Sequence, residues 1–169
     1  MSIRDHGLEK HIKVSAEHDR RVKLVKIPTP VTIFEQNRGA IKGRLSGRCA
    51  CDFLGWIVGG HALYIEAKAT ATNAHRWRPD ERLKTYQLPW LIEAAGQGVI
   101  CAVYLRHNST DYLIPVTQSG LPFTATSVLW EGLVKWAIPR GRPWMDAIMD
   151  KDGTFIRWGR YLEHGWAIK

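Results

Sequence analysis

The segment CDFLGWIVGGHALYIEAKAT, residues 51–70, predicts a β-hairpin with charged residues inside an otherwise apolar stretch. Two runs of strand-forming residues flank Gly59-Gly60, which marks the turn. Side chains of a strand alternate between its two faces, so Glu66 and Lys68 point to one face and Leu63 and Ile65 to the other. The second strand therefore has one charged face and one apolar face.

The side on which Asp52 lies depends on the register of this hairpin. Asp52 shares a face with Glu66 only if paired residues have numbers that sum to an even value such as 118, which requires a three- or five-residue connection or a bulge. A two-residue Gly59-Gly60 turn would pair Val58 with His61 and would place Asp52 on the opposite face.

Two carboxylates on adjacent strands have a clear chemical use. They supply hard oxygen ligands for Mg²⁺, and a nearby ammonium can orient or help to deprotonate an attacking water, which are the requirements of phosphodiester hydrolysis. The alternative is a surface hairpin in which Glu66 and Lys68 form an ion pair beside an unrelated Asp52. Neighbours such as Phe53 and Trp56 favour the metal site, because carboxylates in apolar surroundings need a compensating charge.

Length and composition predict one globular domain over residues 1–169. Apolar residues make up 45% of the chain and eight are Trp, which excludes the polar, aromatic-poor class of disordered proteins. A formal net charge of +8 predicts a surface that attracts polyanions, nucleic acid above all. The alternative is a basic protein with no anionic partner.

The cysteines and apolar segments bear on the compartment. Cys49, Cys51 and Cys101 form neither a C-x-x-C pair nor an even set, which argues against a zinc ribbon and a secreted disulfide scaffold. The N-terminus has no signal-peptide pattern, and no segment is long and apolar enough to span a membrane. We therefore expect a cytoplasmic protein.

The segments before the hairpin predict a helix, strands and a basic arm. Leu8, Ile12 and Ala16 recur four apart, which favours an amphipathic helix over residues 7–21. The following segment alternates as strands do, with a bend at the Pro-Thr-Pro of residues 28–30. Residues 36–48 contain no acid and suit a flexible basic loop or protruding arm that contacts phosphate; their positive residues are Arg38, Lys42, Arg44 and Arg48.

The segments after the hairpin predict a helix and a second pair of strands. Apolar spacing favours a helix from about Thr85, its expected N-cap, to Ala95, with Gln87 and Pro89 in the first turn. GVICAVYL at 98–105 has the pattern of a buried strand. DYLIPV at 111–116 is its expected hairpin partner, residues 126–138 have a helix-like pattern, and the tryptophans Trp144, Trp158 and Trp166 are expected in the core.

Taken together, these motifs resemble the PD-(D/E)XK nuclease superfamily, in which an Asp precedes E-x-K on the next strand. The context is similar to Holliday-junction resolvases of the RecU type. It comprises KIPTPV at 26–31, CDFLG at 51–55, YIEAKAT at 64–70, YQ at 86–87 and GQGVICAVYL at 96–105. The resemblance covers residues 7–117 as a family-like core and leaves 120–169 as a C-terminal extension; Tyr86 stands where the family has a histidine, and the basic segment is shorter than the family's.

The resemblance implies a restriction-endonuclease-like α/β fold, with a mixed central β-sheet flanked by helices, and a homodimer that cleaves four-way DNA junctions in recombination and repair. Asp52 and Glu66 would bind Mg²⁺, with Mn²⁺ as a substitute, Lys68 would position the attacking water, and Gln87 and Glu9 would assist. Glu35 is the competing accessory acid. Phosphate contacts are expected from the basic arm and from Arg76, Arg78, Arg82 and Lys84.

Two rival functions remain open from the sequence. One is a nuclease of the same superfamily that acts on other DNA structures. The other is a non-catalytic, basic nucleic-acid-binding module in which the hairpin acids are structural, and it predicts salt-sensitive binding without dependence on a divalent metal.

Overall fold

The computed structural model of the chain describes residues 6–28, 31–37, 40–45, 51–70, 73–124 and 126–151. Its helices are α1 (His6–Glu17), α2 (Pro79–Arg82), α3 (Gln87–Gly96) and α4 (Trp130–Leu133), with the short 3₁₀ helices η1 (Val134–Trp136) and η2 (Trp144–Ala147). Its strands are β1 (Val22–Lys26), β2 (Val31–Asn37), β3 (Ala40–Leu45), β4 (Phe53–Ile57), β5 (His61–Thr70), β6 (Arg76–Trp77), β7 (Ile100–His107), β8 (Thr110–Val116) and β9 (Val128–Leu129).

A mixed five-stranded sheet of order β1-β4-β5-β7-β8 forms the centre of the fold. Its neighbours are antiparallel except for β5 and β7, which are parallel. Parallel neighbours need a crossover connection, and here the chain between β5 and β7 contains β6, α2 and α3. The expected α/β class with a mixed central sheet is confirmed.

The β4–β5 hairpin has the register that places Asp52 toward Glu66. Pairs run from Phe53↔Ile65 to Ile57↔His61, so the residue numbers of each pair sum to 118. Residues 58–60 make the connection, and both of its glycines have positive φ, 92° at Gly59 and 83° at Gly60, a conformation that disfavours other residues. The structure thus has the even register that a shared face requires, with the three-residue form of the connection.

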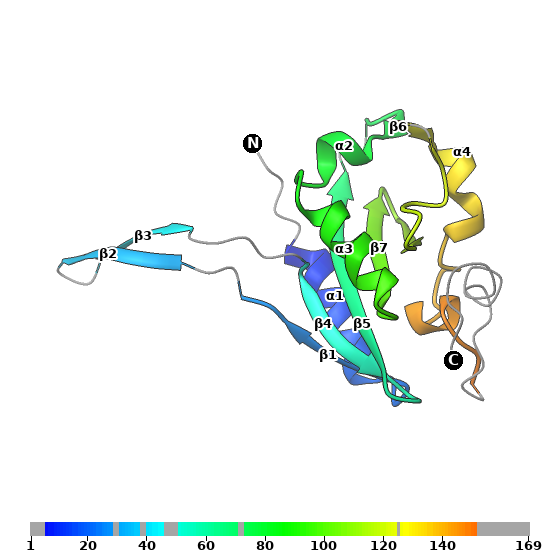
Figure 1. Cartoon of the computed structure of the whole chain (residues 1–169), viewed down its shortest axis with the longest axis horizontal. Helices are drawn as coiled ribbons and strands as arrows, with labels where there is room; N and C mark the ends of the chain where they lie inside the picture. Colours follow the sequence, from blue (N-terminus) through cyan, green and yellow to red (C-terminus); the bar gives the residue numbers. More distant parts are fainter. Residues whose placement is uncertain are drawn as a thin grey trace.

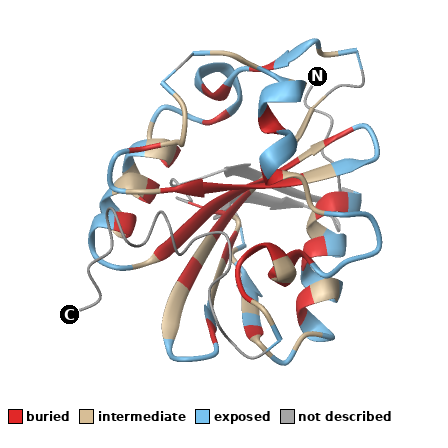
Figure 2. Cartoon of the chain, turned by 90° about the vertical axis from the view of Figure 1, so that its right-hand side faces the viewer, coloured by how far each residue is buried: buried red, intermediate tan, exposed pale blue. Residues whose placement is uncertain are grey.

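Apolar layers cover both faces of the sheet. On one face, α1 contributes Leu8 and Ile12 to a core with Phe53, Leu63 and Ile65. On the other face, α3, α4 and η1 pack over a second core whose buried members include Leu91, Val103, Leu133 and Trp136. Figure 2 shows this arrangement, with buried residues along the middle strands and exposed ones on the outer sides of the helices.

The helix predictions are correct in outline and wrong at two places. The helix expected over 7–21 is α1, which ends earlier at Glu17, and the helix expected from Thr85 is α3. Thr85 is not its N-cap, because α3 begins at Gln87 after Tyr86, whose side chain makes no capping hydrogen bond. Gln87 and Pro89 lie in the first turn, as predicted.

The C-terminal part of the described chain joins the main core. Residues 126–138 do not form one helix: Val128–Leu129 pairs with β6, and only short α4 and η1 follow. Strand pairing of Val128–Leu129 replaces the helix pattern there. Trp144 is buried as predicted, at 1% exposure, whereas Trp158 and Trp166 lie outside the described residues.

The basic segment 36–48 lies largely in an antiparallel ribbon and is not the flexible loop that was one of its two expected forms. Strands β2 and β3 pair with each other, with Thr32 opposite Arg44 and Glu35 opposite Lys42. Figure 1 shows this ribbon extending away from the five-stranded sheet, as the expected arm would. Arg38 and Arg48 lie outside the described residues.

No helix among the described residues is long and apolar enough to cross a membrane.

Candidate active site

Asp52 directly precedes β4 and is held through both its backbone and its side chain. Its backbone N–H donates to the carbonyl of Ile65 at 3.1 Å, and its own carbonyl accepts from the N–H of Ile27 at 2.8 Å. The carboxylate oxygen Oδ2 accepts a hydrogen bond from the N–H of Ala67 at 2.8 Å. This bond from β5 fixes the Asp52 carboxylate beside the residue that follows Glu66.

Glu66 is a fully buried carboxylate whose two oxygens have different surroundings. Oε1 accepts a hydrogen bond from Gln87 Nε2 at 2.7 Å and another from the ammonium of Lys68. Oε2 is buried and has no hydrogen-bond partner among the described residues. Because a buried carboxylate oxygen normally has a partner, this atom points to a missing cation or donor.

Gln87 and Lys68 hold Glu66 from different elements. Gln87 is the first residue of α3 and is 4% exposed. Its Oε1 accepts the N–H of Lys84 at 2.9 Å, which orients the amide so that Nε2 faces Glu66. Lys68 lies two residues along β5, on the same face as Glu66, and its side chain is 20% exposed.

Burial and charge act together on the acidity of Glu66. Burial first, and then the neighbouring charge of Asp52, raise the pKa of Glu66 to about 7, although Lys68 and Gln87 act in the opposite direction. The Asp52 contribution shows that the two carboxylates interact. A nearby cation would favour the ionised form of both acids.

The donor set fits a hard divalent cation. Asp52 and Glu66 offer two carboxylates, and Glu66 Oε2 has a free buried lone pair in this part of the structure. No group of three or more His, Cys, Asp or Glu residues able to hold a metal occurs within the described ranges. Two carboxylates nevertheless suit Mg²⁺, which usually keeps several waters and binds through one or two carboxylates and substrate phosphates.

Of the two expected accessory acids, the structure describes side-chain contacts for Glu9. Glu9 lies on α1, and its carboxylate forms an ion pair with Lys26 of β1. Lys26 is paired with Phe53, whose side chain belongs to the core on the α1 side of the sheet, whereas Gln87 approaches Glu66 from α3. For Glu35, the structure describes only the backbone pairing with Lys42.

Two of the arginines expected to contact DNA, Arg76 and Arg78, lie in the crossover between β5 and β7. Arg76 is on β6, and Arg78 directly precedes α2, where it forms an ion pair with Glu81. Both side chains are exposed. They belong to the same connection that brings Gln87 to Glu66.

Sequence reasoning missed one contact beside the acids. Tyr64 shares the charged face of β5, and its ring stacks on Trp90 of α3 at a centroid distance of 4.9 Å. The signal was available, because Trp90 follows Gln87 by three residues and therefore lies on the same side of the helix. The stack covers the sheet next to Glu66 and keeps α3 close to β5.

Comparison with protein-family models and with curated protein sequences finds no match for this chain.

Proposed function

We propose that the protein is a Mg²⁺-dependent endodeoxyribonuclease that resolves four-way DNA junctions by phosphodiester hydrolysis. The observation that carries this proposal is the buried Glu66 carboxylate, with one oxygen held by Lys68 and Gln87 and the other without a partner in the described structure. Asp52 contributes the second carboxylate. A purely structural acid would be expected to have both oxygens satisfied.

In this mechanism Asp52 and Glu66 hold the metal. Mg²⁺ supplies charge neutralisation at the scissile phosphate and lowers the pKa of a bound water. Gln87 keeps Glu66 Oε1 directed toward Lys68, so that the second oxygen remains available. The partly exposed ammonium of Lys68 lies beside these carboxylates, where it orients the attacking water and stabilises the negative charge that develops.

The choice of substrate rests on charge and on the sequence resemblance. A net charge of +8 and a basic β2–β3 ribbon favour a nucleic-acid partner. The mixed sheet with helices on both faces supports the restriction-endonuclease-like fold that the resemblance implies. Cleavage of two strands of a four-way junction requires two active sites, so the proposal includes a homodimer that acts in the cytoplasm.

The test uses labelled four-way junction and a matched linear duplex, each with Mg²⁺ or with EDTA. We expect paired, metal-dependent nicks in the junction for the wild-type protein. Asp52→Asn should abolish cleavage and leave junction binding largely intact, because the fold keeps the hairpin. Glu93→Gln, which neutralises an exposed acid on α3, is the matched control and should cleave normally.

The other outcomes separate the rival functions. Cleavage of both substrates would favour a general nuclease of the same superfamily. Salt-sensitive binding without any product would favour a non-catalytic nucleic-acid-binding module. Equal cleavage by wild type and Asp52→Asn would contradict the metal assignment.

A further inference from the structure

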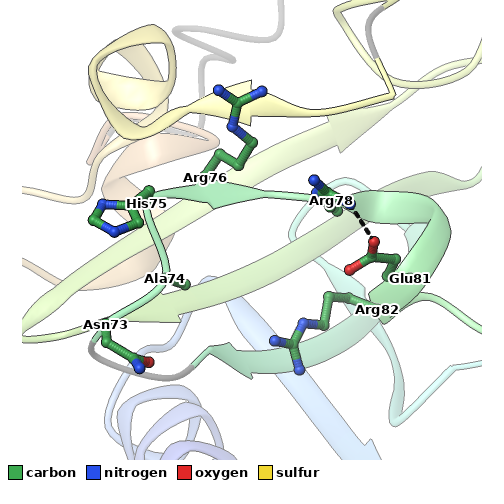
Figure 3. A pocket seen from close by; sticks show the side chains of 7 residues that line it. All are labelled: Asn73, Ala74, His75, Arg76, Arg78, Glu81 and Arg82. Carbon is green, nitrogen blue, oxygen red and sulfur yellow. Dashed lines mark hydrogen bonds and ion pairs between the residues drawn. The ribbon is translucent and has the colours of Figure 1, made fainter.

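A basic hollow lies between β6 and α2, in the crossover that follows β5. Its volume is about 340 Å³, and its lining includes Asn73, His75, Arg76, Arg78, Glu81 and Arg82. Figure 3 shows the three arginines around it and the ion pair between Arg78 and Glu81. The lining carries three arginines and one glutamate, a positive balance that suits an anion.

Alternation of exposed and buried residues keeps Arg76 and Arg78 at the protein surface. Trp77 and Pro79 are buried, whereas Arg76 and Arg78, which alternate with them along the chain, are exposed. Leu83, at 5% exposure, anchors the end of α2 in the same way. The apolar residues attach this segment to the second core, so the charged ones must point outward.

The walls of the hollow are fixed by contacts from the C-terminal part of the chain. Trp130 Nε1 donates a hydrogen bond to the carbonyl of Ala74 at 2.7 Å. Arg76 pairs with Leu129 in the β6–β9 ladder, and its Nη1 donates to Ser127 Oγ at 3.2 Å. A guanidinium held in this way loses little conformational freedom when it binds a ligand.

The acids near the hollow neutralise its arginines only in part. Arg78 forms an ion pair with Glu81, and the negative charge of Asp80 also attracts Arg78. The side chain of Arg82 takes part in no ion pair within the ranges that the structure describes. Guanidinium groups bind phosphate oxygens with two parallel hydrogen bonds, so phosphate is the ligand that this lining fits best.

We propose that this hollow binds a backbone phosphate of the substrate DNA strand, away from the scissile bond, and so positions the strand across the metal site. The identity of the ligand as DNA rests on the proposed function. The chain connects the hollow to the active site in both directions: β5, which carries Glu66, precedes the hollow in sequence, and the segment after α2 leads to Gln87, which bonds Glu66.

The test measures binding of the full chain to a fluorescent four-way junction and a matched duplex, in EDTA, at several salt concentrations. The variants are Arg76→Gln, Arg82→Gln and the double variant, with Arg142→Gln as the control, because Arg142 is also exposed and lies in the C-terminal segment before η2. Each lost phosphate contact should lower the salt slope by about 0.9. Because the hollow binds one phosphate, between 50 and 200 mM salt the affinity of wild type should fall about 3.5-fold more than that of the double variant.

A second measurement locates the phosphate. Single methylphosphonates remove one backbone charge at a time, and substitution of the phosphate that the hollow binds should weaken wild type but have no further effect on the double variant. Unchanged salt slopes in a double variant with wild-type thermal stability, or equal effects of Arg142→Gln, would overturn the proposal. Arginine-dependent binding without Mg²⁺-dependent cleavage would instead retain the hollow and refute the nuclease function.

Discussion

We expect the metal-free protein to lose stability as the pH rises through the range in which Glu66 ionises. Burial and the charge of Asp52 raise the pKa of Glu66 from 4.5 to about 7, so between these values the folded state binds a proton that the unfolded state releases. The free energy of unfolding therefore falls with increasing pH. At ~1.4 kcal/mol per pH unit, the two pKa values correspond to about 3 kcal/mol, most of it lost between pH 5 and 8.

The Glu66→Gln variant should remove this pH dependence, because its amide does not titrate. Urea denaturation in EDTA at several pH values between about 5 and 8 measures the free energy of unfolding of both proteins. The difference between their pH profiles isolates Glu66, since all other titrating groups are shared. Glu93→Gln should keep the wild-type profile because Glu93 is exposed. Parallel profiles for wild type and Glu66→Gln would refute the reasoning.

Three further substitutions test contacts that stabilise the fold. Arg21→Met should lower the free energy of unfolding by about 1–3 kcal/mol, because Arg21 bonds the carboxylate of Asp19. Burial raises the pKa of Asp19, but the bonds from Arg21 outweigh it and the pKa is lowered in the folded protein. In acid titrations the destabilisation should therefore shrink as the pH falls through the folded-state pKa of Asp19. Gly55→Ala should prevent or severely weaken folding, as measured by thermal melting, because a Cβ there would lie 2.0 Å from the carbonyl oxygen of Lys23. Trp144→Ala should destabilise the protein by about 3–5 kcal/mol in urea, whereas a peripheral C-terminal extension would tolerate it.

The two strands and the glycine turn of the hairpin could be predicted from local signals, whereas its register could not. The apolar residues of β5 fix which face is buried, but the parity of the register follows only if Asp52 and Glu66 are assumed to share a face. Positive φ at Gly59 and Gly60 then permits the three-residue connection. The buried strand β7 was equally clear, since its continuous apolar run matches a central strand covered on both sides.

The features that were missed depend on contacts distant in sequence. Residues 126–138 have helical spacing, but pairing of Val128–Leu129 with β6 outweighs that local preference. The arginines of the crossover were expected to contact phosphate, yet the hollow exists only because Trp77 and Leu83 are anchored in the core. The ion pair of Glu9 with Lys26 likewise joins residues of different elements, α1 and β1.

The unpartnered oxygen of Glu66 links the stability of the fold to metal binding. Lys68 and Gln87 both bond Oε1 and favour the ionised carboxylate, but burial and the charge of Asp52 outweigh them, and Oε2 has no partner among the described residues. A cation that binds only the folded state at about a hundred times its Kd would contribute ~2.7 kcal/mol, which is comparable with the penalty that Glu66 imposes near neutral pH. Mg²⁺ should therefore stabilise the wild-type protein most at high pH, where Glu66 is already ionised, and should release a proton when it binds below about pH 7.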